Sequence, residues 1–268
     1  MAGGFAIADF SLCLSRLFIQ ESIMLIRQGT SRTDATDRRL ACTLAAVAGA
    51  LNTAAFYAVG FFSANMTGNV SSLSDHAARG DWLTGIFYLL IVVIFVLGAS
   101  SSTLFVNAGR RRQVRSIYAI TILIEGVLLV ALGLVELWIP SLQKGPVLIL
   151  GLSYLMGLQN AVVTHISNAR VRTTHVSGMS TDIGIELSML FDIARGKEEP
   201  SEATQYKSRL RLHTQTVLSF LGGGVVGVLL YQAIGDRLLF VTGAVLMGIA
   251  TLAIVRANTA ISTGLLRR

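Results

Sequence analysis

WLTGIFYLLIVVIFVLGASSSTLFVN, residues 82–107, runs for 26 positions without a charged side chain. An α-helix rises about 1.5 Å per residue, so about 20 apolar residues cross the roughly 30 Å hydrocarbon core of a bilayer. Further stretches of similar length and character cover residues 40–62, 116–135, 147–167, 214–234 and 238–255. The sequence therefore predicts an all-α integral membrane protein with about six transmembrane helices.

The composition indicates that lipid is the main solvent of the chain. Hydrophobic residues make up 53% of the sequence and charged residues 14%, whereas about a quarter of a soluble domain is charged. The net charge of +7 does not indicate nucleic acid, because the basic residues lie in short clusters beside apolar stretches. The two cysteines, Cys13 and Cys42, lack the spacing of a metal site or disulfide framework, so neither a metal nor a cofactor is expected.

The basic residues also predict the orientation of the helices, because cytoplasmic loops of membrane proteins are enriched in Lys and Arg. With the N-terminus inside, 19 of the 22 basic residues lie on the cytoplasmic side, and Arg79, Lys144 and Arg237 lie outside. One helix more or fewer before the C-terminus would move the later basic clusters to the other side of the membrane, so the bias would be lost. We therefore expect a cytoplasmic N-terminal segment at residues 1–39, a membrane domain at 40–258 and a cytoplasmic tail at 259–268.

The first predicted helix lies in an uncharged interval that continues well beyond the end of the helix. No charged residue occurs from Leu40 to Ser74, which is too long for one untilted helix. Its second half is polar and includes Asn65, Thr67 and Asn69. Irregular backbone at membrane depth is tolerated where protein covers it. The interval therefore predicts a re-entrant turn or half-helix after helix one.

The two halves of the sequence share a pattern of glycine, asparagine and a hydroxyl-glycine pair. The residues are Gly49, Asn52, Thr67 and Gly68 in the first half, and Gly157, Asn160, Ser177 and Gly178 in the second. Each half holds an odd number of helices, so the second enters the membrane upside down. The pattern predicts two inverted three-helix repeats, residues 40–137 and 146–256, with a second half-helix after helix four. Chance similarity is the alternative, because these residue types are common in membrane helices.

The same motifs resemble those of a known family. Residues 61–69, FFSANMTGN, with 157–161, GLQNA, and 173–178, TTHVSG, are similar to the YoaK-like family of bacterial six-helix inner-membrane proteins. The resemblance covers about residues 38–258, and Ser177 stands where family members often have threonine. It implies a six-helix fold in a bacterial inner membrane. It implies no substrate, because the family is a domain of unknown function.

The repeated motifs also supply the candidate binding residues. A helix N-terminus presents unpaired N–H groups and a partial positive charge, which suit a polar or anionic ligand. The candidate substrate-binding residues are Asn52, Asn65, Thr67, Gly68, Asn69, Gln159, Asn160, Ser177 and Gly178. The alternative is structural: Thr67 and Ser177 cap their own helices, and Asn52 and Asn160 bridge neighbouring helices.

Two carboxyl groups are candidates for proton coupling. Glu125 lies in the middle of the third predicted helix, where a charge costs roughly 2.5 kcal/mol or more unless it is paired or neutralised. Asp182 and Glu186 are four residues apart on the second half-helix, and Asp182 is expected in its first turn, where capping is the alternative role. Arg170 and Arg172 are interpreted as positive-inside anchors, which pair with Asp182 or Glu186 if the segment folds back.

We expect a small secondary transporter or channel-like carrier of a small polar or anionic solute. The alternative is a non-transporting assembly or regulatory protein with a dry interior. An enzyme is not expected, because the nucleophile-elbow, zinc-protease and phosphate-loop motifs are missing from the sequence. The expected partners are the bilayer and the solute. A homodimer is left open, because the close-packing spacing of Gly223 and Gly227 serves contacts within one chain or between two.

Overall fold

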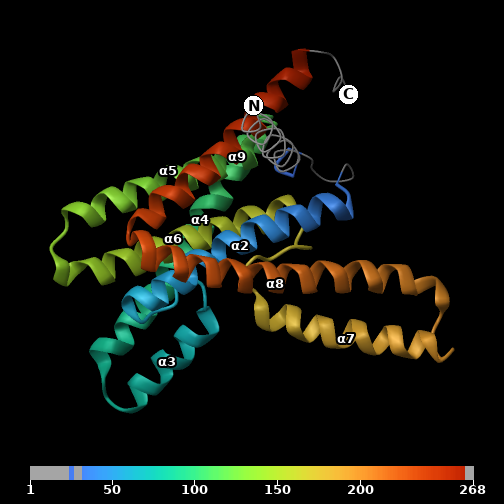
Figure 1. Ribbon diagram of the computed structural model, residues 1–268, viewed down its shortest axis with the longest axis horizontal. Helices are drawn as coiled ribbons and strands as arrows, with labels where there is room; N and C mark the ends of the chain where they lie inside the picture. The colour runs from blue at the N-terminus through green and yellow to red at the C-terminus, as the bar shows by residue number, and fades with distance from the viewer. Residues whose placement is uncertain (1–23, 27–31, 263–268) are drawn as a thin grey trace, which may run out of the picture.

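The computed structural model describes residues 24–26 and 32–262. Most of the predicted N-terminal segment and the end of the predicted tail lie outside these residues. The described residues form α2 (Asp34–Val59), α3 (Met66–Ala78), α4 (Trp82–Arg111), α5 (Ile117–Trp138), α6 (Ser141–Ile166), α7 (Val176–Ala194), the short 3-10 helix η2 (Pro200–Glu202), α8 (Ala203–Ile234) and α9 (Arg237–Ser262) (Figure 1). No β-strand occurs among them, so the all-α prediction is confirmed.

Helices α2, α4, α5, α6, α8 and α9 are long and apolar enough to cross a bilayer. They coincide with the six stretches predicted from the sequence, and by these helices the chain is a multi-pass membrane protein. Each helix extends beyond its predicted apolar stretch at one end or both, because polar residues continue it. For example, α8 begins at Ala203, well before the apolar stretch at 214–234.

The start and the end of α2 are set by ordinary capping residues. Thr33 precedes the helix, and its hydroxyl oxygen accepts a 3.3 Å hydrogen bond from the amide of Thr36. Gly60 follows the helix with φ +76°, a left-handed conformation that glycine adopts without steric cost. The chain therefore leaves α2 at Gly60 and enters segment 61–65, which leads directly into α3.

The six long helices pack in three pairs: α2 lies along α8, α4 along α6, and α5 along α9 (Figure 1). Each short helix lies against the helix that follows it, α3 against α4 and α7 against α8. Each pair joins a helix of the first half of the chain to one of the second, and α2 also contacts α6. In the view of Figure 1, α3 and α7 lie in the lower part of the picture and apart from each other, with α7 alongside α8.

Glycines allow two of these helix pairs to approach closely. A Cβ atom at Gly49 of α2 would lie 2.1 Å from the carbonyl oxygen of Phe220 in α8. A Cβ atom at Gly157 of α6 would lie 2.0 Å from the carbonyl oxygen of Phe95 in α4. Both distances are far inside van der Waals contact, so the backbones can meet only where a side chain is lacking.

The glycine face of α8 also packs inside the chain. A Cβ atom at Gly223 would lie 2.1 Å from the carbonyl oxygen of Ala46, and one at Gly227 would lie 2.5 Å from the Cα atom of Ala50. Both alanines belong to α2. Of the two roles considered for this spacing, the structure therefore shows contact within one chain.

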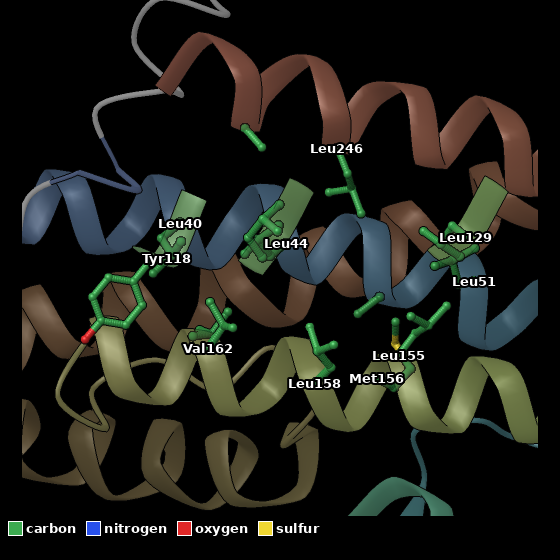
Figure 2. Close-up of a cluster of buried hydrophobic side chains, with 14 of the residues drawn as sticks. Leu40, Leu44, Leu51, Tyr118, Leu129, Leu155, Met156, Leu158, Val162 and Leu246 are labelled. Carbon is green, nitrogen blue, oxygen red and sulfur yellow. The ribbon is translucent and has the colours of Figure 1, made fainter. Parts of the chain in front are cut away.

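A core of aliphatic side chains fills the centre of the bundle (Figure 2). Leu40, Leu44 and Leu51 are buried on one face of α2, where they share the core with Met156 of α6 and Leu246 of α9. Lipid is as apolar as leucine, so close packing rather than removal from water stabilises such a core. Large apolar side chains of α4 and α8 remain exposed on the outside of the bundle, as expected of helices that face lipid.

A cluster of ion pairs ties the segment after α6 to the start of α2. The guanidinium group of Arg170 lies 2.7 Å from Oδ1 of Asp34 and 3.0 Å from Oδ2 of Asp37. Arg32 lies 2.6 Å from the other carboxylate oxygen of Asp37, which is buried. The hydrogen bond to Asp34 raises the pKa of Arg170, so this guanidinium stays charged. The cluster fixes where the segment leading to α7 begins.

Candidate binding cavity

A cavity of about 1340 Å³ lies between α2, α4, α6 and α8, and the first residues of α3 and α7 also line it. Asn52 of α2, Thr103 of α4, Asn160 of α6 and Val225 of α8 each contribute to its wall. The cavity thus brings together the two similar motifs, which lie in opposite halves of the sequence.

Asn52 holds the segment that leads into α3. Its side-chain oxygen accepts a 2.8 Å hydrogen bond from the backbone amide of Ala64 and a 3.4 Å hydrogen bond from the hydroxyl of Ser63. Asn52 is buried, so these bonds satisfy polar groups that have little access to water. The asparagine therefore positions the first turn of α3 beside the cavity.

Asn160 makes a similar arrangement in the second half of the chain. Its side-chain oxygen accepts hydrogen bonds from the hydroxyl groups of Thr174, at 3.0 Å, and Thr173, at 3.4 Å. Its side-chain amide donates to the carbonyl of Met156, one turn earlier in α6. Asn160 therefore positions the segment that leads into α7. In both halves the asparagine binds the segment that precedes the short helix, rather than a neighbouring helix as expected of the structural alternative.

The residues that cap α3 and α7 differ from the expected ones. Asn65 precedes α3, and its side-chain oxygen accepts a 3.1 Å hydrogen bond from the amide of Gly68. The structural role proposed for Thr67, capping of α3, is therefore wrong, because Asn65 takes that position. His175 precedes α7 without a side-chain capping bond, so Ser177 does not cap α7 either.

The glycine of each motif makes room for the residue three positions earlier. A Cβ atom at Gly68 would lie 2.5 Å from the side-chain nitrogen of Asn65, and one at Gly178 would lie 2.1 Å from the imidazole ring of His175. The glycines therefore have a local packing role. Because no side chain caps α7, its first amide groups keep the partial positive charge of a helix N-terminus.

Six of the predicted binding residues line the cavity, namely Asn52, Asn65, Thr67, Gly68, Asn160 and Ser177. Three others, Asn69, Gln159 and Gly178, do not line it. The side-chain amide of Asn69 is buried and donates to the carbonyl oxygen of Phe62 at 3.1 Å. Gln159 is turned toward α5, as described next. These two residues support the cavity wall from behind.

Glu125 also lies outside the cavity, but a chain of hydrogen bonds connects it to the wall. Its Oε1 atom accepts a 2.9 Å hydrogen bond from the side-chain amide of Gln159. The hydroxyl of Thr173 lies 3.5 Å from Oε1 of Gln159 and 3.4 Å from Oδ1 of Asn160. Asn160 lines the cavity. A buried carboxyl group is thereby linked to the cavity through two amides and a hydroxyl.

Asp182 does not line the cavity. It is the seventh residue of α7, so the predicted position in the first turn is wrong, because α7 begins six residues earlier, at Val176. Glu186, one turn further on, lies 3.0 Å from Nδ1 of His213 in α8. Arg170 does not form the pair with these carboxylates that was considered for a folded-back segment, because Asp34 and Asp37 of α2 hold that arginine. The contact of Glu186 with His213 attaches α7 to α8.

Several lining residues were not among the predicted binding residues, namely Thr103, Thr164, His165, Arg172, Thr174 and His175. Nε2 of His165 lies 3.2 Å from the hydroxyl of Thr103, and this contact joins α6 to α4. Arg172 was interpreted from the sequence as a positive-inside anchor. Its position just before the second motif was the signal that could have identified it as a lining residue. No carboxylate lines the cavity, and Arg172 is its one permanently charged lining residue among those described.

The described residues contain no group of three or more His, Cys, Asp or Glu side chains that lie together. The wall offers amide, hydroxyl, imidazole and guanidinium groups instead. Such groups donate hydrogen bonds to anions and to neutral polar molecules. The arrangement is suited to binding rather than to acid–base chemistry between paired carboxylates.

Comparison with known proteins identifies the family of the chain. Curated proteins and solved structures gave no match. Residues 40–252 match the family described as protein of unknown function (DUF1275). The match covers all of the helices that form the cavity except the first residues of α2. The chain therefore belongs to the DUF1275 family of proteins of unknown function.

Proposed function

We propose that the protein is a small secondary transporter or channel-like carrier of a polar or anionic solute. The observation that carries this proposal is the cavity between the starts of α3 and α7, lined by Asn52, Thr67, Asn160 and Ser177. A protein whose motifs served packing alone would have a dry, filled interior at this point. An open, polar-edged volume between helices is the usual form of a small-molecule site.

The proposal includes an inverted repeat. The packing of α2 with α8 has its counterpart in that of α6 with α4, and the packing of α3 with α4 in that of α7 with α8. The close contact of Gly49 with Phe220 has its counterpart in that of Gly157 with Phe95. Equivalent contacts in the two halves support a common architecture. Inverted three-helix repeats with a site between them are typical of secondary carriers.

The proposal also treats α3 and α7 as re-entrant half-helices. α3 has 13 residues and is therefore about 20 Å long, shorter than the hydrocarbon core. Both helices begin at the cavity and continue beside the helix that follows them. Backbone that starts inside the membrane is tolerated where it lines a cavity.

We place the protein in a bacterial inner membrane with both termini in the cytoplasm. The distribution of basic residues supports this orientation, and the resemblance to the YoaK-like proteins supports this membrane. A homodimer is a further part of the proposal, because the apolar face of α4 is exposed and offers a surface for a second copy. Sedimentation of the detergent complex measures the number of chains.

The experiment that tests the carrier uses the Thr67→Cys and Ser177→Cys variants in a background in which Cys13 and Cys42 are serine. A membrane-impermeant thiol reagent is applied from each side of oriented vesicles. We expect labelling of both variants, with a rate that depends on the side of application. Asn69→Cys is the matched control, because Asn69 is buried behind the cavity and its variant should not react.

Protection of both cavity variants from both sides would overturn the carrier and favour the packed, non-transporting protein. The proton-coupled form of the proposal assigns the titrating role to Glu125 or Asp182. It predicts that the ratio of the labelling rates of Ser177→Cys from the two sides depends on pH and that Glu125→Gln or Asp182→Asn removes this dependence. The ratio is used because the reactivity of the thiol itself changes with pH. Unchanged pH dependence in both variants would eliminate this coupling and leave the carrier itself intact.

A further inference from the structure

The α8 side of the cavity carries a stripe of large aliphatic side chains, Leu221, Val225 and Leu229. These residues line the cavity and are 61%, 55% and 59% exposed. Residues four apart lie on one face of a helix, so the three side chains form a continuous surface. A site for a small hydrophilic solute gains nothing from such a wall. The stripe suits a ligand with an apolar part.

This stripe borders the outer face of α8. Leu218 and Val226 lie beside it around the helix; both are exposed, and neither lines the cavity. α4 lines a different part of the cavity. It packs on α6, whereas α8 packs on α2. The stripe belongs to a helix that is apolar enough to cross the bilayer. The apolar wall of the cavity therefore continues into the surface that faces acyl chains.

Other residues of the cavity lining are polar. Arg172 lines the cavity with an exposed side chain, which makes no hydrogen bond or ion pair with any residue that the structure describes. His175 and Ser177 line the same cavity. No Asp or Glu among the described residues contributes to the lining. A guanidinium group without a protein partner is suited to a carboxylate or phosphate.

We propose that the ligand of this cavity is an amphiphile with an anionic headgroup, which enters sideways from the bilayer. The headgroup pairs with Arg172, and the hydrocarbon chain lies along Leu221, Val225 and Leu229. The volume of about 1340 Å³ exceeds the roughly 1000 Å³ upper range of small-molecule sites and leaves room for a chain. This inference rests on the proposed function, because it names the substrate class of the same cavity.

The test uses the full chain in phosphatidylcholine nanodiscs and two photoreactive probes. One probe is dodecyl phosphate with a diazirine at the end of its chain, and the other is dodecanol with the same group. We expect the phosphate to label the peptide that contains Leu221 to Leu229 about tenfold more than the alcohol does. Arg172→Gln should reduce labelling by the phosphate to the level of the alcohol, whereas Arg112→Gln, a change at an exposed arginine away from the cavity, should not.

A second pair of variants tests the sideways path. Val225→Trp fills the stripe and should block labelling by dodecyl phosphate, whereas Val226→Trp places the same bulk on the neighbouring outer face and should leave it unchanged. Equal labelling by both probes would overturn the inference, because it indicates ordinary lipid contact. Cross-linking of this peptide to a second copy in place of the probe would overturn it as well, since protein would then cover the stripe.

Failure of this inference is distinguishable from failure of the carrier. If inorganic phosphate displaces dodecyl phosphate and the cavity cysteines still label in a side-dependent way, the carrier stands and takes a soluble anion. If dodecyl phosphate binds through Arg172 while Thr67→Cys and Ser177→Cys show no access from either side, the amphiphile site stands without transport.

Discussion

The side-chain amide of Gln159 donates a 2.9 Å hydrogen bond to Oε1 of Glu125, and both side chains are fully buried. The second carboxyl oxygen of Glu125 has no hydrogen-bond partner among the described residues. The bond joins α5 to α6. Glu125 therefore depends on a single neutral partner, and loss of that partner leaves a buried polar group unsatisfied.

We predict that Gln159→Leu destabilises the protein by about 1–3 kcal/mol, the usual cost of a buried group that loses its partner. The double variant Glu125→Leu with Gln159→Leu should recover most of this loss, because both polar groups are then absent. The apparent Tm of the protein in detergent measures the effect. A double variant no more stable than Gln159→Leu would show that the pair itself holds α5 to α6.

The glycines of α8 give a matched pair of substitutions. We predict that Gly223→Ala lowers the apparent Tm through an overpacking cost of about 1–3 kcal/mol, because its Cβ atom would lie 2.1 Å from the carbonyl oxygen of Ala46. Gly222→Ala meets no atom within 4 Å and should be neutral or slightly stabilising, since alanine favours the helix. Equal effects of the two variants would contradict the packing of α2 on α8.

The length of the apolar stretches was sufficient to predict the six long helices from the sequence, because a helix that crosses the hydrocarbon core needs about 20 apolar residues in a row. The helix ends were harder to predict, because polar residues such as those of 203–213 continue α8 beyond its apolar stretch. α3 and α7 are too polar to be predicted from hydrophobic length. The sequence indicated them only through the long uncharged interval after the first helix and through the repeated motif. Their lengths follow from tertiary contacts with α4 and α8.

The candidate site was predictable only in part. Asn52, Thr67, Asn160 and Ser177 were found through the repeated motif, and all four line the cavity. Gln159 is next to Asn160 in sequence, but consecutive helix residues point in different directions, so it faces Glu125 instead. The apolar α8 wall had no sequence signal, because its residues resemble any lipid-facing stripe.

The anchoring of segment 61–65 by Asn52 can be measured directly. We predict that Asn52→Ala speeds hydrogen exchange at the Ala64 amide by about fivefold or more, because this amide loses its 2.8 Å acceptor. Asn160→Ala is the control, since that side chain binds the segment before α7, whereas the Ala64 amide donates to Asn52. Unchanged exchange at Ala64 in Asn52→Ala would mean that the short turn before α3 holds itself in place.

Two arginines in one segment separate the structural role from the binding role. Arg170 pairs with Asp34 and with the buried Asp37, so Arg170→Gln should lower stability by about 1–3 kcal/mol. Arg172 has no such partner among the described residues, so Arg172→Gln should leave the apparent Tm unchanged. High salt should weaken the Asp34 pair, which is half-exposed, more than the Asp37 pair, which water cannot screen. If Arg172→Gln proved the more destabilising change, Arg172 would have a structural partner, and the argument for a free guanidinium in the cavity would fail.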